Sequence, residues 1–186
     1  MVRVRDGRVV EEHHWLIRPP IDADWFDEWN TAIHGITAEM VANAPRRSEI
    51  LPHIVSFIGN DVVVAHNAAF DTGMVRYACA VDNIEWPELK FLCTLVLARR
   101  ALSLPSYRLP FVAESLGCEL GARHDALADA RAVVEIVRRL PQTQSAADTG
   151  CLAKSVGVAI GTMGSGVYKG SVATGGGSGR SFPRSR

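Results

Sequence analysis

Asp61-Val-Val-Val-Ala65, followed directly by His66-Asn-Ala-Ala-Phe-Asp71, is the stretch that decides the fold class of this 186-residue chain. A continuous apolar run rich in β-branched residues is typical of a strand buried on both faces in a parallel sheet. The residues after it predict a helix from about 69 to 80. A strand that leads into a helix is the repeating unit of α/β folds, and polar residues at such a transition lie where open α/β sheets bind ligands.

The residues on either side of this unit extend the same pattern. Apolar and polar residues alternate in residues 1–5 and again in residues 8–18, on either side of Asp6-Gly7. This pattern predicts a hairpin with a type I′ turn and a long second strand. A short strand is expected at 91–94. Apolar residues at helical spacing predict further helices at 48–58, 110–117 and 125–140, the first with Ser48 as its cap. The expected class is an α/β mixed sheet flanked by helices.

The composition changes sharply after Pro141. Ten of the sixteen glycines fall in residues 142–186, together with many Ser and Thr. Such a composition offers little apolar surface to bury. We therefore predict one domain over residues 1–141 and a flexible tail or linker over residues 142–186.

The net charge is zero, but it is unevenly distributed. Residues 142–186 carry five Lys or Arg and one acid, a net charge of +4, so residues 1–141 carry −4. A protein that coats DNA through many phosphate contacts is expected to be basic. If the substrate is a nucleic acid, we expect few contacts to it, with metal ions supplying positive charge.

The cysteine spacing and the lengths of the apolar runs indicate the cellular compartment. The four cysteines show no Cys-x-x-Cys spacing, so neither a zinc site nor a disulfide framework is predicted. No apolar run approaches the length of a bilayer span, and the N-terminus lacks a signal-peptide pattern. We expect a soluble, cytoplasmic protein with no membrane partner.

Two short stretches carry residues suited to catalysis. In the first, His66, Asn67 and Asp71 lie where the buried strand gives way to a helix. The alternative is that Asn67 caps this helix and Asp71 lies on its solvated first turn. In the second, His124 precedes a helix and Asp129 lies just over one turn inside it. Here the alternative is a surface histidine followed by an ordinary helix acid.

Together, these residue types match the requirements of phosphodiester hydrolysis. That reaction needs an activated water and neutralisation of charge on the phosphate and the leaving oxygen, which two Mg²⁺ ions can supply. Mg²⁺ prefers oxygen ligands, so Asp71 and Asp129 are candidate metal ligands. A histidine whose pKa lies near neutrality can accept the proton of the water, so His124 is the candidate base.

Over residues 1–140 the chain resembles the DnaQ-type (DEDDh) 3′-5′ exonucleases, which include the epsilon subunit of bacterial DNA polymerase III. Four motifs carry the resemblance and appear in the family's order: His-Gly-Ile-Thr at 34–37, His-Asn-Ala-Ala-Phe-Asp at 66–71, the stretch from Cys93-Thr94-Leu95 to Leu104-Pro-Ser-Tyr-Arg-Leu109, and His-Asp-Ala-Leu-Ala-Asp at 124–129. The resemblance implies a ribonuclease H-like mixed sheet.

The resemblance also implies roles for single residues. Asp71 is similar to the acid of the family's second motif, Asp129 to its last metal ligand and His124 to its general base. His66 and Asn67 would shape the rim of the substrate pocket.

The resemblance further implies a cofactor and partners. The complete domain would use two Mg²⁺ or Mn²⁺ ions. It would act on single-stranded DNA 3′ ends, with a DNA polymerase subunit as a candidate partner. Ile36 would contact the terminal base, although an anchor within a buried loop is an equally good interpretation.

The chain departs from the family at its first motif. The family places an Asp-x-Glu pair on a central strand, whereas this sequence opens with what resembles the family's second strand. Asp22 and Asp24 follow two prolines in an irregular segment, and Glu11 and Glu12 point to opposite sides of a strand. The N-terminal central strand is therefore expected to be missing, with the natural product starting further upstream.

Three functions remain open from the sequence. The first is a 3′-5′ exonuclease that releases nucleoside 5′-monophosphates from DNA in replication proofreading or repair. The second is a related enzyme that trims RNA 3′ ends. The third is a non-catalytic module that binds nucleic-acid ends or a polymerase.

Overall fold

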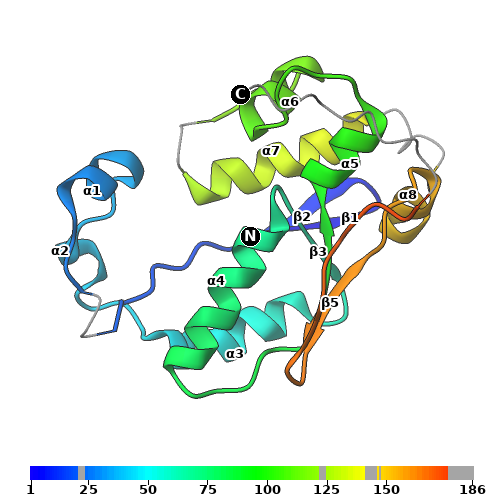
Figure 1. The fold of residues 1–186 in the computed structure, drawn as a ribbon. Helices are drawn as coiled ribbons and strands as arrows, with labels where there is room; N and C mark the ends of the chain where they lie inside the picture. Colours follow the sequence, from blue (N-terminus) through cyan, green and yellow to red (C-terminus); the bar gives the residue numbers. More distant parts are fainter. Residues whose placement is uncertain (21–23, 122–124, 141–145, 147, 176–186) are drawn as a thin grey trace, which may run out of the picture.

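The computed structural model describes residues 1–20, 24–121, 125–140, 146 and 148–175. In chain order the elements are β1 (Val2–Arg5), β2 (Arg8–Glu12), α1 (Glu28–His34), α2 (Ala38–Val41), α3 (Arg47–Ile58), β3 (Val62–Ala65), α4 (Ala68–Val81), β4 (Leu89–Cys93), α5 (Thr94–Ala101), α6 (Leu109–Ser115), α7 (Ala126–Arg139), α8 (Thr149–Ser155), β5 (Gly161–Gly164) and β6 (Val167–Lys169). Figure 1 shows their arrangement.

The N-terminal hairpin is formed as the sequence predicts. β1 and β2 pair antiparallel, and Asp6 and Gly7 both have positive φ, at 49° and 69°. A type I′ turn requires positive φ at both central residues, which Asp-Gly tolerates. The second strand ends at Glu12 and not at residue 18. The prediction of a long second strand was therefore wrong.

The main sheet is mixed and has the strand order β3-β4-β5-β6. β3 and β4 run parallel, with Ala65 opposite Cys93, while β4, β5 and β6 pair antiparallel. The helix α4 connects the two parallel strands, as a parallel crossover requires. The expected α/β class with a mixed sheet flanked by helices is confirmed.

Two apolar clusters cover the opposite faces of this sheet, because successive side chains of a strand point to opposite sides. Val62, Val64 and Leu92 pack with residues of α5 to α8. Val63 and Phe91, one position along, pack in a second cluster that includes residues of α4 and the β5–β6 hairpin. The parallel strand ends are thereby held between helices on both sides.

Residues 148–175 form a packed part of the domain, so the prediction of a flexible tail was wrong for them. Leu152 and Val158 join the cluster on one face of the sheet, and Met163 joins the other. β5 pairs with β4, placing Gly161 opposite Phe91. Backbone pairing with β4 gives this glycine-rich segment a fixed place that its composition did not predict. Residues 176–186, the rest of the predicted tail, lie outside the described residues.

The two sheets remain separate in the described residues, because no strand lies hydrogen-bonded between β1 and β3. A central strand at that position was expected to be missing from this sequence. All four residues of β3 are only half-buried, whereas Phe91 and Leu92 of β4 are fully buried. β3 has one strand neighbour and β4 has two, which accounts for the difference. The expectation that β3 is buried on both faces was wrong.

Helices α1 and α2 project from the body of the domain (Figure 1). Asp27 caps α1 by accepting a hydrogen bond from Asn30 N at 3.0 Å, and Gly35 ends it with φ 71°. Local capping therefore defines α1, which has no buried residue. α3 starts one residue earlier than predicted, because Glu49 accepts from the backbone N–H of Arg46; Ser48 is not its cap.

Candidate active site at the ends of β3 and β4

His66 anchors the site at the carboxyl ends of the two parallel strands. It directly follows β3, and Thr94 directly follows β4, so the register of the strands brings the two side chains together. His66 Nδ1 lies 3.0 Å from Thr94 Oγ1, and Nε2 lies 2.9 Å from the carbonyl oxygen of Tyr107. Thr94 is fully buried. Both ring nitrogens of His66 are thus engaged by the protein itself.

These contacts constrain the hydrogen-bonding roles of His66. The carbonyl of Tyr107 can only accept, so Nε2 donates to it. The hydroxyl of Thr94, which lies 3.0 Å from Nδ1, also donates to the carbonyl of Ala65 at 3.4 Å. Burial lowers the pKa of His66, opposed by the hydrogen bond to Tyr107. Burial thus favours the neutral ring of His66, which ties the end of β3 to the loop before α6.

The side chain of Tyr107 holds the loop between α5 and α6, whose backbone contacts His66. Its hydroxyl donates to the carbonyl of Leu102 at 3.1 Å and accepts from the N–H of Leu104 at 3.3 Å. Sequence reasoning missed Thr94 and Tyr107 as site residues, although both lie in a motif that carried the family resemblance. The signal for Thr94 was its place at the end of the strand predicted at 91–94.

Asp71 enters the site from the first turn of α4. Asn67, just before this helix, has left-handed backbone angles of φ 66° and ψ 45° and makes no side-chain capping hydrogen bond. Asn67 therefore occupies the N-cap position of α4, but its side chain does not cap the helix. A non-glycine residue in this conformation is uncommon and is found at functional sites. Partial burial raises the pKa of the Asp71 carboxyl.

Asp129 reaches the same region from α7. Asp125 caps this helix by accepting from Ala128 N at 2.7 Å, as its position predicted, and Asp129 lies one turn further on. Asp71 and Asp129 both act on His66 electrostatically, each raising its pKa. The helices that carry the two carboxylates, α4 and α7, both contact β3, the strand that leads into His66. His124, the predicted base, lies outside the described residues.

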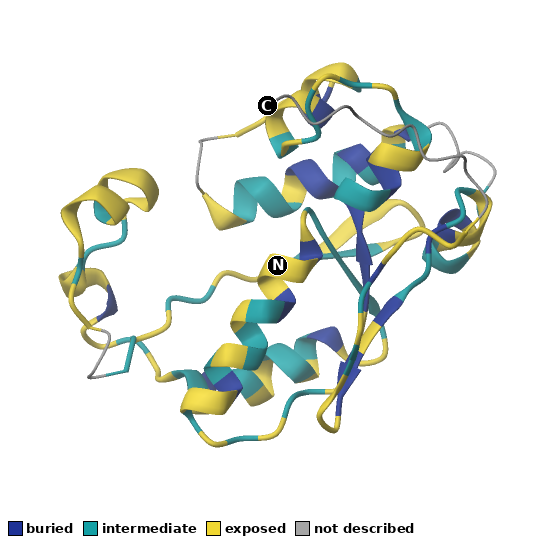
Figure 2. Ribbon diagram, in the orientation of Figure 1, coloured by how far each residue is buried: buried dark blue, intermediate teal, exposed yellow. Residues whose placement is uncertain are grey.

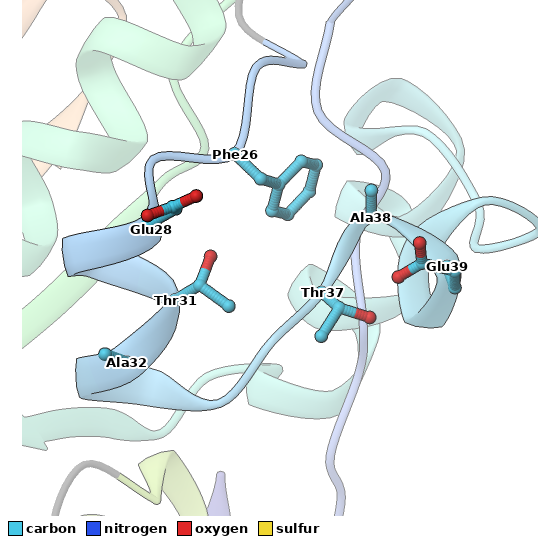
Figure 3. Close-up of a pocket in the computed structure, with 7 residues that line it drawn as sticks. All are labelled: Phe26, Glu28, Thr31, Ala32, Thr37, Ala38 and Glu39. Carbon is cyan, nitrogen blue, oxygen red and sulfur yellow. The ribbon is translucent and has the colours of Figure 1, made fainter.

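Ile36 lies on a different part of the molecule. It is the half-buried residue between α1 and α2, and its N–H donates to His34 Nδ1 at 3.0 Å. An open pocket lies between the two helices and contains none of the predicted site residues (Figure 3); its lining residues are Phe26, Glu28, Thr31, Ala32, Thr37, Ala38 and Glu39. The structure therefore places His66, Asn67 and Asp71 at the junction of β3 and α4, Asp129 on α7, which contacts β3, and Ile36 on the projecting segment between α1 and α2.

The donor set of this site fits part of a Mg²⁺ centre. Carboxylate oxygens are suitable ligands, and Asp71 and Asp129 supply two carboxylates. Among the described residues, no group of three or more His, Cys, Asp or Glu side chains could hold a metal ion. Two carboxylates are too few for two ions that each take about six oxygen ligands. The described residues could therefore supply some, but not all, of the ligands of a metal centre.

The exonuclease family model RNase T matches residues 1–137 of the chain. The chain belongs to this exonuclease family. The match covers both stretches that form the site and ends within α7. Its members are hydrolases, so the enzyme class expected from the resemblance is confirmed.

Individual relatives agree with this assignment. A putative bifunctional exonuclease/endonuclease of Mycobacterium tuberculosis is 39% identical over 142 residues, 75% of this chain and 22% of that protein. DNA polymerase III subunit epsilon of Aquifex aeolicus is 32% identical over 73% of this chain and 66% of its own length. The chain thus spans about a fifth of the first relative and two thirds of the second.

The structural comparison agrees as well. The solved structure of exonuclease X in complex with 5′ overhanging duplex DNA has a TM-score of 0.62 and 26% identity, covering 84% of this chain and 87% of that chain. The similarity to DEDDh exonucleases expected from the four motifs is thereby confirmed. No helix in the described parts of the chain is long and apolar enough to cross a membrane.

Proposed function

We propose that this domain is a metal-dependent 3′-5′ exonuclease that acts on DNA and releases nucleoside 5′-monophosphates. The observation that carries the proposal is that Asp71 and Asp129 lie in the first turns of α4 and α7, two helices that both contact β3, the strand that leads into His66. Membership of an exonuclease family supports the reaction type. The names of relatives, which include a DNA polymerase III subunit and an exonuclease bound to DNA, support DNA as the substrate.

In this proposal Asp71 and Asp129 are metal ligands. Bound Mg²⁺ or Mn²⁺, two ions in the complete site, would neutralise charge on the phosphate and the leaving oxygen. Burial raises the pKa of Asp71, and a bound cation would oppose this shift by stabilising the carboxylate. An Asp-x-Glu pair, absent from the described site, would supply the remaining carboxylates.

The histidines have separate roles in this proposal. His124 would accept the proton of the attacking water. His66 cannot serve as a second base without breaking its hydrogen bonds to Thr94 and Tyr107. It instead positions the strand end from which Asn67 and α4 depart. Asn67 and Ile36 would contact the substrate.

The setting follows from the same relatives. A DNA polymerase subunit is the candidate partner, and replication proofreading or repair is the candidate process. We place the protein in the cytoplasm, where bacterial DNA polymerase III works. Single-stranded 3′ ends are the proposed substrate.

A non-catalytic module is the second candidate function. The observation that favours it is the small donor set, since the described residues contribute only two carboxylates at the site. In that case the domain would bind nucleic-acid ends or a polymerase without cleaving. RNA 3′ ends are the alternative substrate for the catalytic form.

A digestion experiment distinguishes the exonuclease from the non-catalytic module. Single-stranded DNA labelled at the 3′ or the 5′ end, and RNA of the same sequence, would be incubated with Mg²⁺ and two forms of the protein. One form is this chain, and the other carries an Asp-x-Glu strand at its N-terminus. The proposal expects labelled mononucleotide to be released first from 3′-labelled DNA by the extended form, and release to stop with EDTA.

Matched variants test the assigned residues in the extended form. Asp129→Asn should lower the rate by about a hundred-fold or more, since a metal ion contributes several kcal/mol to such reactions. Asp24→Asn, at an exposed acid outside the site, should leave the rate unchanged. Tight binding of DNA ends without any cleavage by the extended form would favour the non-catalytic module.

A further inference from the structure

One stretch of this otherwise acidic domain is purely basic. Residues 1–141 carry a net charge of −4, yet residues 89–113 contain four basic residues and no Asp or Glu. The four are Lys90, Arg99, Arg100 and Arg108. The stretch runs from β4 through α5 into α6, so it passes the carboxyl end of β4, where the candidate site lies. It therefore brings positive charge without compensating acids to the neighbourhood of that site.

Arg99 is joined to the candidate site through Tyr107. The guanidinium carbon of Arg99 lies over the ring of Tyr107, 5.9 Å from the ring centroid. The carbonyl of the same tyrosine accepts a hydrogen bond from Nε2 of His66 at 2.9 Å. Helix α5, which carries Arg99, also contacts α7, which carries Asp129. A single residue thus links the Arg99 guanidinium to the histidine at the end of β3.

The positive charge of Arg99 acts within the site and is open to solvent. Burial lowers the pKa of His66, and Arg99 lowers it further, whereas Asp71 and Asp129 oppose this. Arg99 is exposed at the end of α5 (Figure 2). Among the residues that the structure describes, it forms no ion pair. Its charge is therefore available to an anion that approaches from solvent.

The adjacent Arg100 has a different partner. It is exposed in the same last turn of α5, but its Nε donates to the carbonyl of Val156, at the end of α8, at 3.1 Å. Two neighbouring arginines thus carry the same charge on the same helix. Arg99 contacts the loop that holds His66, whereas Arg100 contacts the segment after α8. Arg100 is therefore a matched control for any role of Arg99.

We propose that Arg99 binds a backbone phosphate of the strand whose 3′ end occupies the candidate site, an inference that rests on the proposed exonuclease function. A guanidinium presents its N–H donors in a planar fork that suits phosphate oxygens. Contact with the face of the Tyr107 ring uses none of these donors. Metal ions at Asp71 and Asp129 would neutralise the scissile phosphate. Arg99 therefore holds a phosphate on its 5′ side.

Binding without cleavage tests the contact first. A fluorescein-labelled single-stranded DNA oligonucleotide would be titrated with the full chain in EDTA and followed by fluorescence anisotropy. Arg99→Gln should weaken binding about ten-fold and lower the slope of log Kd against log salt concentration by about 0.7, the loss of one phosphate contact. Arg99→Lys keeps the charge but not the fork, so its affinity should lie between those of Arg99→Gln and the wild type. A thermal melt confirms that each variant is folded.

The matched control decides whether Arg99 makes a direct contact. Arg100→Gln removes the same charge and should leave the affinity within about two-fold of the wild type, because only a screened long-range attraction is lost. Equal affinities of Arg99→Gln and Arg100→Gln would overturn the phosphate contact.

Kinetics separate this contact from the proposed function. In the form that carries Asp-x-Glu, Arg99→Gln should raise KM about ten-fold with kcat nearly unchanged, because a phosphate away from the reacting bond is held equally in the ground and transition states. Cleavage with a KM that Arg99→Gln leaves unchanged would overturn the contact and leave the exonuclease. Weaker binding by Arg99→Gln alone, with no cleavage by any form, would support the contact and overturn the exonuclease.

Discussion

Residues 25–41 and residues 148–175 each differ in burial from what their compositions predict. The first region contains Trp25, Trp29 and Ile33, all exposed on the projecting helix α1 and the segment before it. The second is rich in glycine, yet it contributes Leu152 and Met163 to the two apolar clusters. Apolar content alone thus does not determine which segment joins the core.

The difference lies in how each region is tied to the sheet. β5 pairs with β4, and Ser171 Oγ accepts from the backbone N–H of Cys93 at 3.2 Å. A Cβ on Gly161 would lie 2.4 Å from Phe91 Cζ, so glycine is what lets β5 lie against this ring. Residues 25–41 have no strand that pairs with the main sheet, and α1 is defined by local caps.

The largest expected effect comes from Leu152→Ala in the glycine-rich region. Leu152 is 2% exposed, and its truncation leaves a cavity between α8 and the sheet. We expect a loss of about 2 to 5 kcal/mol in the free energy of unfolding, measured by urea denaturation. Leu120→Ala, at a leucine that is 39% exposed, is the control. Equal losses for the two variants would mean that residues 148–175 do not pack as described.

Gly161→Val tests whether the close approach of β5 and Phe91 needs glycine. The added side chain forces the ring or the strand to shift, with an expected loss of about 1 to 3 kcal/mol. Gly175→Val has no atom within 4 Å of its added Cβ and should cost much less. Thermal unfolding of both variants gives the comparison. A Gly161→Val protein as stable as the wild type would refute the steric account.

The site shows that burial can also oppose folding. The pKa of Asp71 is raised in the folded state, so the folded protein binds its proton more strongly than the unfolded chain does. Its contribution to stability therefore falls as pH rises from the unfolded pKa through the folded one. With EDTA present, Asp71→Asn should gain stability relative to the wild type between pH 3 and pH 7. A stability difference independent of pH would contradict the shift.

The smallest effect is expected on the projecting helices. Trp29 is 77% exposed, so Trp29→Ser should change the free energy of unfolding by no more than about 0.5 kcal/mol. Trp86→Ser is the matched variant, because Trp86 packs against the apolar cluster that contains Phe91. It should lower the free energy of unfolding clearly more than Trp29→Ser does. A large loss for Trp29→Ser would show that α1 packs against the domain.

Much of the fold was predictable, since local patterns were enough to define it. Asp6-Gly7 predicted the turn of the hairpin, and the apolar run before His66 predicted β3. The half-burial of β3 was not predictable from its own residues, because it depends on the position of β3 at the edge of the sheet in the described residues. β5 was missed because glycine content gives no sign that Phe91 lies opposite Gly161.

The candidate site was predictable in part. The motifs predicted that His66, Asp71 and Asp129 belong together, which stays a prediction, although both carboxylates act to raise the pKa of His66. They did not predict that Thr94 and Tyr107 form hydrogen bonds with the two ring nitrogens of His66, since those contacts join segments far apart in the sequence. Spacing within a motif indicates which residues share a site, while tertiary contacts decide which of them remain available to a substrate.

The central claim is that Asp71 and Asp129 serve one metal-dependent site, and a double-variant rate measurement tests it most directly. In the form that carries Asp-x-Glu, the initial rate of mononucleotide release from 3′-labelled DNA would be measured for Asp71→Asn, Asp129→Asn and the double variant. Residues that act as a unit have non-additive effects. We predict that all three variants fall to a similar residual rate. Losses that multiply in the double variant, or a single variant with the wild-type rate, would contradict a shared site.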